Sequence, residues 1–253
     1  MIYLIFYFKT FRKNGMKTKG NEIEKIYFSY RFVFENGEEK TFEIALDSSS
    51  LNIIRGENIL NPNWTLRKEF GCEIMECPLK DSDHCHIAVN LQNVIDFFSD
   101  IPSYEKVKIY VSSPERDYFK DTSVQHGVGS ILGILMVSSG CPVLGKLKPL
   151  VRHHLPFASI EETEFRVFSM YLLAQLLKYR KGEKPDWDLD GLKKLYEDIR
   201  KINQNVATKI ADLEHKDASI NAIIVLNNFA DSVTFSIDDN DLSQVEYLFK
   251  EWL

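Results

Sequence analysis

The chain has 253 residues, which is enough to bury a hydrophobic core without disulfides and predicts one or two domains. Hydrophobic residues make up 44% and charged residues 27% of the sequence, as is typical of globular proteins. The formal net charge of −6 argues against general nucleic-acid binding, because that function needs a basic surface to displace counterions.

The first eight residues are all apolar, and basic residues follow them. This run is too short to span a bilayer, and the order of its charges is the reverse of that in a secretory signal. No later segment has eighteen uninterrupted apolar residues, so we expect no transmembrane segment and a cytoplasmic protein. We interpret residues 1–22 as an N-terminal extension, with Met1 or Met16 as the true start.

The first half of the chain has the pattern of strands joined by turns. Aromatic and polar residues alternate over 24–34 and 40–46, and Asn36-Gly37 between them predicts a hairpin with a type I′ turn. Residues 47–63 read as a loop, and 65–75 as a third strand.

A helix and a second hairpin come next. Apolar residues at helical spacing predict a helix over 87–98, which ends before Pro102. Strands are expected at 106–111 and 117–120, with a turn at Pro114 between them. These elements would add two strands to the first hairpin.

The central helix, expected over 124–138, is apolar almost all round and should therefore be buried. Gly129 and Gly133 lie on one of its faces and would let another element approach closely. Ser159 and Glu162 form a capping box that predicts the start of a further helix, over 160–179.

The remainder of the chain is helical. Residues 181–185 are the best linker candidate. We therefore predict an α+β fold, with an N-terminal antiparallel sheet packed on a largely helical C-terminal half. The expected units are an α+β core over 23–180 and a helical region over 181–253 that packs on it. Within the latter we expect helices over 189–213, 217–229 and 239–252, with residues 230–235 as an alternative extension of the second.

The clearest candidate for chemistry is a set of cysteines and histidines. Three of the four cysteines fall within fourteen residues, and His84 and His86 flank the third of them. Thiolates and imidazoles are the ligands that zinc and iron–sulfur clusters take. The predicted ligands are Cys77, Cys85 and Cys141, completed by Cys72, His84 or His86.

Two interpretations of these cysteines stay open. The spacing matches no common zinc-finger or iron–sulfur motif, and Cys72 in a strand pattern could simply belong to the core. On the other side, Cys85 precedes a helix start, where free N–H groups stabilise a thiolate. Cys77 and Cys141 are each followed by proline, which turns the chain away from a cluster and slightly favours iron–sulfur over zinc.

A second candidate is an anion or phosphate pocket made by basic residues of one short segment. It would be formed by Lys148, Arg152, His153 and His154. The competing interpretation, which we favour, is a solvated basic face. No catalytic motif with a nucleophile, a phosphate-binding loop or a zinc-protease helix is present in the sequence.

Three sequence blocks resemble those of a family of uncharacterised bacterial proteins. They are CPL…HCHIAVNL over 77–91, SSGCP…LKP…HLPFAS over 138–159, and SMYLLAQ over 169–175. The resemblance extends over about residues 23–250. It implies a bacterial cytoplasmic protein that forms one integrated unit, and it supplies no catalytic residues because the family has no established activity.

Three hypotheses about function follow from these observations. The first is a structural or sensory metal site formed by the cysteines and histidines. The second is a non-enzymatic scaffold that self-associates as a homo-oligomer, or binds a protein partner, through its helical half. The third is a small-molecule-binding enzyme with a pocket under the Gly129/Gly133 helix near His153 and His154.

Overall fold

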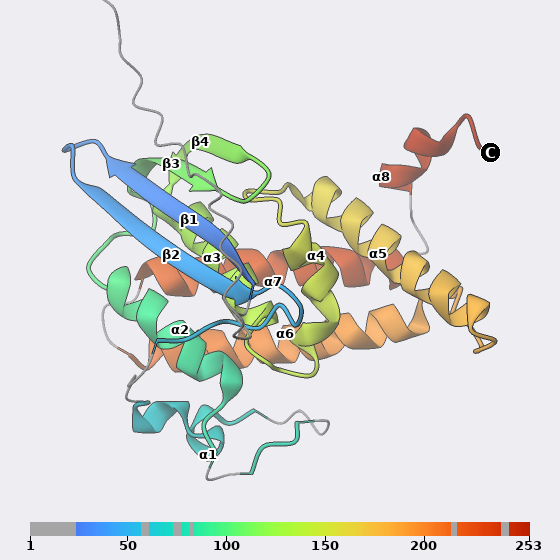
Figure 1. The fold of residues 1–253 in the computed structure, drawn as a ribbon, viewed down its shortest axis with the longest axis horizontal. Helices are drawn as coiled ribbons and strands as arrows, with labels where there is room; N and C mark the ends of the chain where they lie inside the picture. Colours follow the sequence, from blue (N-terminus) through green and yellow to red (C-terminus); the bar gives the residue numbers. More distant parts are fainter. Residues whose placement is uncertain (1–23, 57–60, 73–76, 81–82, 214–216, 239–242) are drawn as a thin grey trace, which may run out of the picture.

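The computed structural model describes residues 24–56, 61–72, 77–80, 83–213, 217–238 and 243–253. The predicted N-terminal extension therefore lies outside the described residues. The fold is α+β, as predicted: an antiparallel sheet from the first half of the chain packs on helices that come mostly from the second half (Figure 1).

Two hairpins build a four-stranded antiparallel sheet with the order β2-β1-β3-β4. Every second residue of β1 is buried, because the side chains of a strand alternate between its faces. The inner face of β1 thus carries Phe28, Tyr30 and Phe32. The strands are β1 (Lys25–Phe34), β2 (Glu39–Asp47), β3 (Lys106–Ser112) and β4 (Asp117–Ser123).

The first hairpin is confirmed, but its turn is not the predicted type I′. Gly37 has a positive φ of 85°, whereas Asn36 does not have a positive φ. The Asn36 side chain instead accepts a hydrogen bond of 2.8 Å from the amide of Glu38. The loop is therefore longer than a two-residue turn and needs the left-handed conformation only at its glycine.

Between the hairpins, the predicted strand over 65–75 is wrong in its described part. The chain there forms a 3-10 turn, η1 (Asn63–Thr65), and a short helix, α1 (Arg67–Phe70). α1 ends at Gly71, whose φ of 69° lies in the left-handed region that terminates helices. The predicted longer helix that follows is confirmed as α2 (His86–Phe97).

The central predicted helix is confirmed as α3 (Val124–Val137), and ten of its residues are buried. It lies between the sheet, α2 and the helical half, because it contacts β3 and β4 as well as α2 and α7. The buried side chains of the sheet, α2, α3, α6 and α7 form one continuous hydrophobic cluster.

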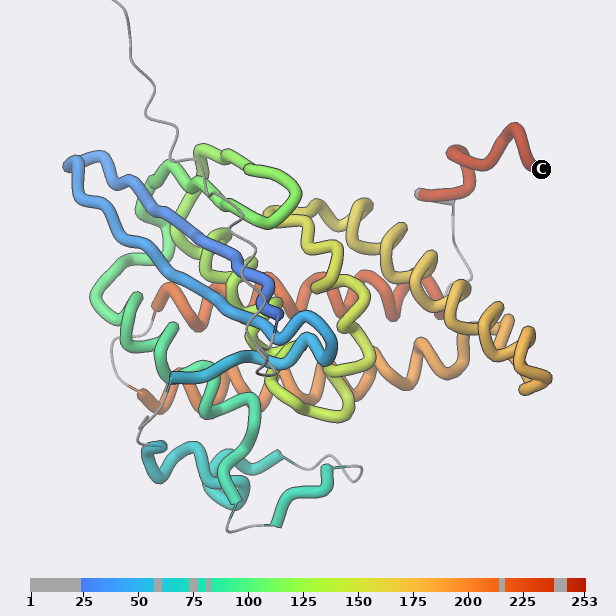
Figure 2. Tube along the Cα trace, viewed as in Figure 1, coloured from blue at the N-terminus to red at the C-terminus, as the bar shows by residue number. Residues whose placement is uncertain are grey.

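The helical half wraps around α3. The capping box at Ser159 and Glu162 is present at the start of α5. α6 and α7 lie side by side, and Figures 1 and 2 show α7 passing behind the sheet. The elements are η2 (Leu144–Leu147), α4 (Lys148–Arg152), α5 (Ile160–Arg180), α6 (Asp190–Ala211), α7 (Asp217–Asp238), α8 (Ser243–Glu246) and η3 (Tyr247–Phe249).

One helix within the described ranges, α7, is long and apolar enough to cross a membrane by length and composition alone. α7 packs against α3, α5 and α6. A helix that packs on neighbours from several sides passes the same test as a membrane span, so α7 gives no clear transmembrane segment.

Candidate functional site

Cys85 is the N-cap residue of α2, as the sequence predicts. Burial raises the pKa of its thiol to about 11, and the nearby backbone amides of Ala88 and Ile87 lower it by less. The thiol makes no capping hydrogen bond to the helix. Cys85 is therefore a protonated thiol at neutral pH.

Burial affects the Cys141 thiol in the same way. It follows Gly140, whose φ of 100° turns the chain after α3. Burial, the largest effect, raises the pKa of the Cys141 thiol, and the nearby backbone amides of Leu144 and Val143 lower it by less. The thiols of Cys85 and Cys141, far apart in the sequence, are thus both kept protonated by burial.

The surrounding segments are brought together by direct contacts. A Cβ added to Gly140 would lie 3.2 Å from Nδ1 of His86, so the residue before Cys141 lies against the residue after Cys85. On the other side, the amide of Arg67 in α1 donates to the carbonyl of Asp83 at 2.8 Å. This second contact holds α1, and with it the chain leading to Cys72, beside the start of α2.

The four cysteines lie in the same part of the described structure. Electrostatic effects act from Cys72 on Cys85 and Cys141, and from Cys77 on Cys141, and they raise the pKa values by less than burial does. No disulfide joins any of the four cysteines.

The ligand set is not closed in this arrangement. Among the residues that the structure describes, no three His, Cys, Asp or Glu side chains are placed to hold one metal ion. His84 is engaged elsewhere, because its Nδ1 lies 2.7 Å from Oγ1 of the buried Thr65. His86 is the histidine that lies nearer to the Cys141 segment.

The four basic residues predicted as an anion pocket are not placed together. Lys148 Nζ donates to the Ser50 carbonyl at 2.6 Å and to Asn52 Oδ1 at 2.7 Å, which ties α4 to the loop after β2. Arg152 and His153 are exposed. His154 alone of the four lines the large cavity described next.

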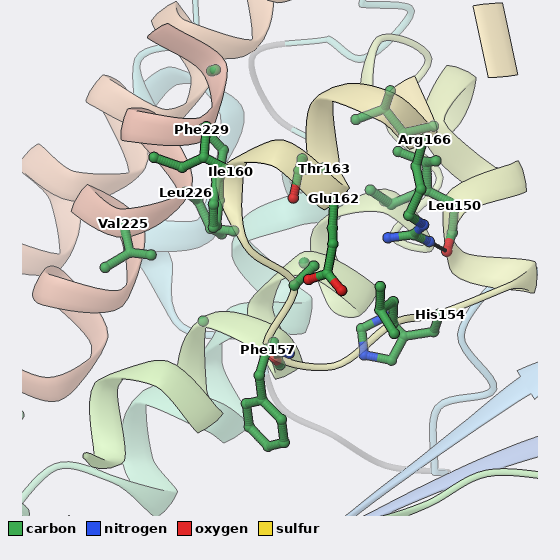
Figure 3. Close-up of a pocket in the computed structure, with 18 of the residues that line it drawn as sticks. Leu150, His154, Phe157, Ile160, Glu162, Thr163, Arg166, Val225, Leu226 and Phe229 are labelled. Carbon is green, nitrogen blue, oxygen red and sulfur yellow. Dashed lines mark hydrogen bonds between the residues drawn. The ribbon is translucent and has the colours of Figure 1, made fainter. Parts of the chain in front are cut away.

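A cavity of about 600 Å³ lies between α3, α4, α5, α6 and α7. It adjoins Gly129 and Gly133 on α3, and most of its wall is apolar. Figure 3 shows apolar side chains of α7 on one side and His154 and Arg166 on the other. The α7 side chains are Val225, Leu226 and Phe229.

His154 is a neutral, fixed group at this cavity. Its Nε2 lies 2.5 Å from the hydroxyl of Tyr30, which is fully buried in β1. Burial, and secondarily the charge of Arg166, lower the pKa of His154 to about 3. Burial also raises the pKa of Tyr30, so both partners are uncharged at neutral pH.

Arg166 brings a positive charge to the cavity from α5. Its Nη2 donates to the carbonyls of Leu150 at 2.9 Å and His153 at 2.8 Å, at the end of α4. Glu162 acts on it electrostatically, but no carboxylate of the described residues forms an ion pair with it. Burial is the largest effect and lowers its pKa.

Two polar side chains of α6 also line the cavity. Tyr196 and Asn203, seven residues apart and so on one face of the helix, are only 4% and 3% exposed. Neither side chain has a hydrogen-bond partner among the described residues. Neither residue was predicted from the sequence to line a site. Asn203 nevertheless interrupts an apolar stripe of α6 at a position where a core residue is expected.

Comparison with known proteins gives a family but no activity. The sequence model of DUF6901, a domain of unknown function, matches residues 28–250. The chain belongs to this family. No match was found among curated proteins or among solved structures. The DUF6901 match agrees with the predicted resemblance to an uncharacterised family and assigns no role to any residue.

Proposed function

We propose that the protein binds a metal through Cys72, Cys77, Cys85 and Cys141, as a structural or sensory site. The observation that carries this proposal is the contact between the segments of Cys85 and Cys141, in which a Cβ added to Gly140 would lie 3.2 Å from Nδ1 of His86. Cys72 and Cys77 pack against the same hydrophobic cluster. The expected fourth ligand was Cys72, His84 or His86, and we choose Cys72 because His84 contacts Thr65 instead.

The surroundings of the sulfurs suit thiolates bound to a cation. Burial keeps the thiols of Cys85 and Cys141 protonated, and a bound metal would take the place of these protons. The nearby backbone amides, which lower the pKa of both thiols, would favour the thiolates. Four thiolates satisfy either tetrahedral zinc or an iron–sulfur cluster. The proline after Cys77 and after Cys141 favours the cluster.

The test is metal analysis with a visible absorption spectrum on full-length protein purified without oxygen. Iron and sulfide in near-stoichiometric amounts, lost in Cys141→Ser, would support an iron–sulfur site. Zinc near one equivalent, lost in the same variant, would support a zinc site. Ser48→Ala, on a partly exposed serine just after the first hairpin, is the control and should keep the metal.

The proposal fails under one clear set of results. The wild-type protein would be metal-free as purified and would take up neither zinc nor a reconstituted cluster, while circular dichroism showed it to be folded. Cys141→Ser that kept the full metal content would equally remove Cys141 from the site.

Self-association through the helical half stays a prediction. Within its described part, this half exposes large apolar side chains, which are typical of interaction surfaces when they cluster. Light scattering on the full chain would test it, because a monomer at all concentrations would exclude it. The exposed residues include Ile224, Phe235, Trp252 and Leu253.

A further inference from the structure

The cavity between α3 and α7 has the dimensions of a small-molecule site. Its volume of about 600 Å³ falls within the range of about 300–1,000 Å³ that ligand pockets occupy. Protein interiors are otherwise close-packed, because an unfilled void loses contact energy. The apolar wall from α3, α4 and α7 would bury an apolar ligand body.

Arg166 favours a negatively charged ligand, and Lys120 at the same cavity adds a second positive charge. Two carbonyls orient the Arg166 guanidinium, and no carboxylate of the described residues forms an ion pair with it. A guanidinium partly removed from water attracts a carboxylate strongly and can hold it with two parallel hydrogen bonds. Glu162 lies close enough to act on Arg166 and lines the same cavity, which disfavours ligands with several negative charges.

Tyr196 and Asn203 give the site its neutral polar contacts. Tyr196 lines the cavity together with Arg166, and the charge of Arg166 acts on it. The amide of Asn203 lies two helical turns away, about 10 Å along α6. This amide has no hydrogen bond to the described residues and borders the cavity, where a ligand or water can satisfy it.

We propose that this cavity binds an organic monocarboxylate with a long apolar body. The carboxylate pairs with Arg166 and accepts a hydrogen bond from Tyr196, and the apolar walls enclose the body. Asn203 binds a polar atom of the ligand or a water molecule beside it. The site uses none of the cysteines. A failure of the metal proposal would therefore leave this proposal unaffected.

The experiment is calorimetric titration of the full chain with dodecanoate, dodecanol and acetate, below the micelle concentration. Dodecanoate is expected to bind at least about tenfold more tightly than dodecanol, which lacks the charge. Acetate, which lacks the apolar body, should give no measurable binding. These three probes separate the contribution of the charge from that of the cavity.

Variants test the placement of the ligand. Arg166→Gln should weaken dodecanoate binding about tenfold or more and leave dodecanol binding unchanged. Arg152→Gln is the matched control, since Arg152 is an exposed arginine outside the cavity. Because Arg166 also holds the end of α4, Gly133→Leu gives a second test. A Cβ at Gly133 meets no atom within 4 Å, so the larger side chain can fill the cavity and should abolish binding.

Several outcomes would overturn the proposal. One is the absence of dodecanoate binding at about 1 mM. Equal affinities for dodecanoate and dodecanol would remove the role of Arg166. Binding by Gly133→Leu as tight as by the wild type would place the ligand on the outer surface and not in the cavity.

Discussion

Replacing Gly127 by alanine tests how closely α3 lies on the sheet. A Cβ at this position would lie 2.5 Å from both Cδ1 of Ile109 and Cε1 of Phe32, and 2.8 Å from Cζ of the same ring. Real Cβ contacts do not fall below 3.0 Å. Phe32 and Ile109 are both fully buried, so neither can move aside into solvent.

The magnitude follows from two opposing effects. Overpacking of a core costs about 1–3 kcal/mol, whereas alanine is a better helix former than glycine by about 1 kcal/mol. Gly133→Ala on the same helix is the matched control, because its Cβ would meet nothing within 4 Å. The helix-forming term is common to both variants. The difference in unfolding free energy between them should therefore be about 1–3 kcal/mol, with Gly127→Ala the less stable.

Urea denaturation followed by far-ultraviolet circular dichroism would measure this difference. The slopes of unfolding free energy against urea should be equal for both variants, so that the midpoints report stability alone. If Gly127→Ala and Gly133→Ala were stabilised equally, α3 would not approach the sheet as closely as we describe. The position of the cavity beside α3 would then need revision as well.

Three further predictions concern buried titratable groups. The pKa of His154 falls from 6.5 to about 3 on folding, so the unfolded state binds an extra proton between these values and stability decreases as the pH falls. From about pH 7 to about pH 4.5 this costs about 2–3 kcal/mol, and His154→Gln should lose that part of the pH dependence in urea titrations. An unchanged slope would show that His154 is not buried. The raised pKa values of Cys85 and Cys141 predict that metal binding releases protons and tightens with pH, which calorimetry in buffers of different ionisation enthalpy would measure. Binding without proton release would contradict this. Glu164 is buried and accepts hydrogen bonds from Ser232 at 2.5 Å and Ser236 at 3.1 Å. Glu164→Ala should cost about 2–4 kcal/mol, because it leaves two hydroxyls without their acceptor and opens a cavity. A loss below about 1 kcal/mol would refute this role.

Local patterns predicted the regular elements well because each depends on neighbours in the sequence. The alternation in β1 and the capping box at Ser159 are complete signals within a few residues. The prediction of a strand over 65–75 was wrong because the apolar residues of this segment also fit a short strand. Pro62 precedes a 3-10 turn there, and Gly71 ends a short helix. A short apolar run does not distinguish these outcomes without its flanking residues.

The candidate sites were only partly predictable, because both depend on long-range packing. Cys72, Cys77 and Cys85 could be grouped from their spacing, but the approach of Cys141 depends on how the end of α3 contacts the start of α2. The cavity lies between five helices, and two of the cations that line it, Lys120 and Arg166, lie outside the predicted basic segment. Asn203 could have been found, since an amide within an apolar helical stripe is unusual.

The location of Cys141 after α3 has a consequence for the order of events during synthesis. A ribosome would expose Cys72, Cys77 and Cys85 well before the second hairpin and α3 emerge, so a nascent chain offers three thiols and no fourth. Cys141 reaches them only when α3 docks on the sheet and α2. A metal held by all four would therefore bind the folded chain alone, and it would stabilise that state by mass action. The metal content of a preparation would then equal the fraction of molecules in which α3 has docked.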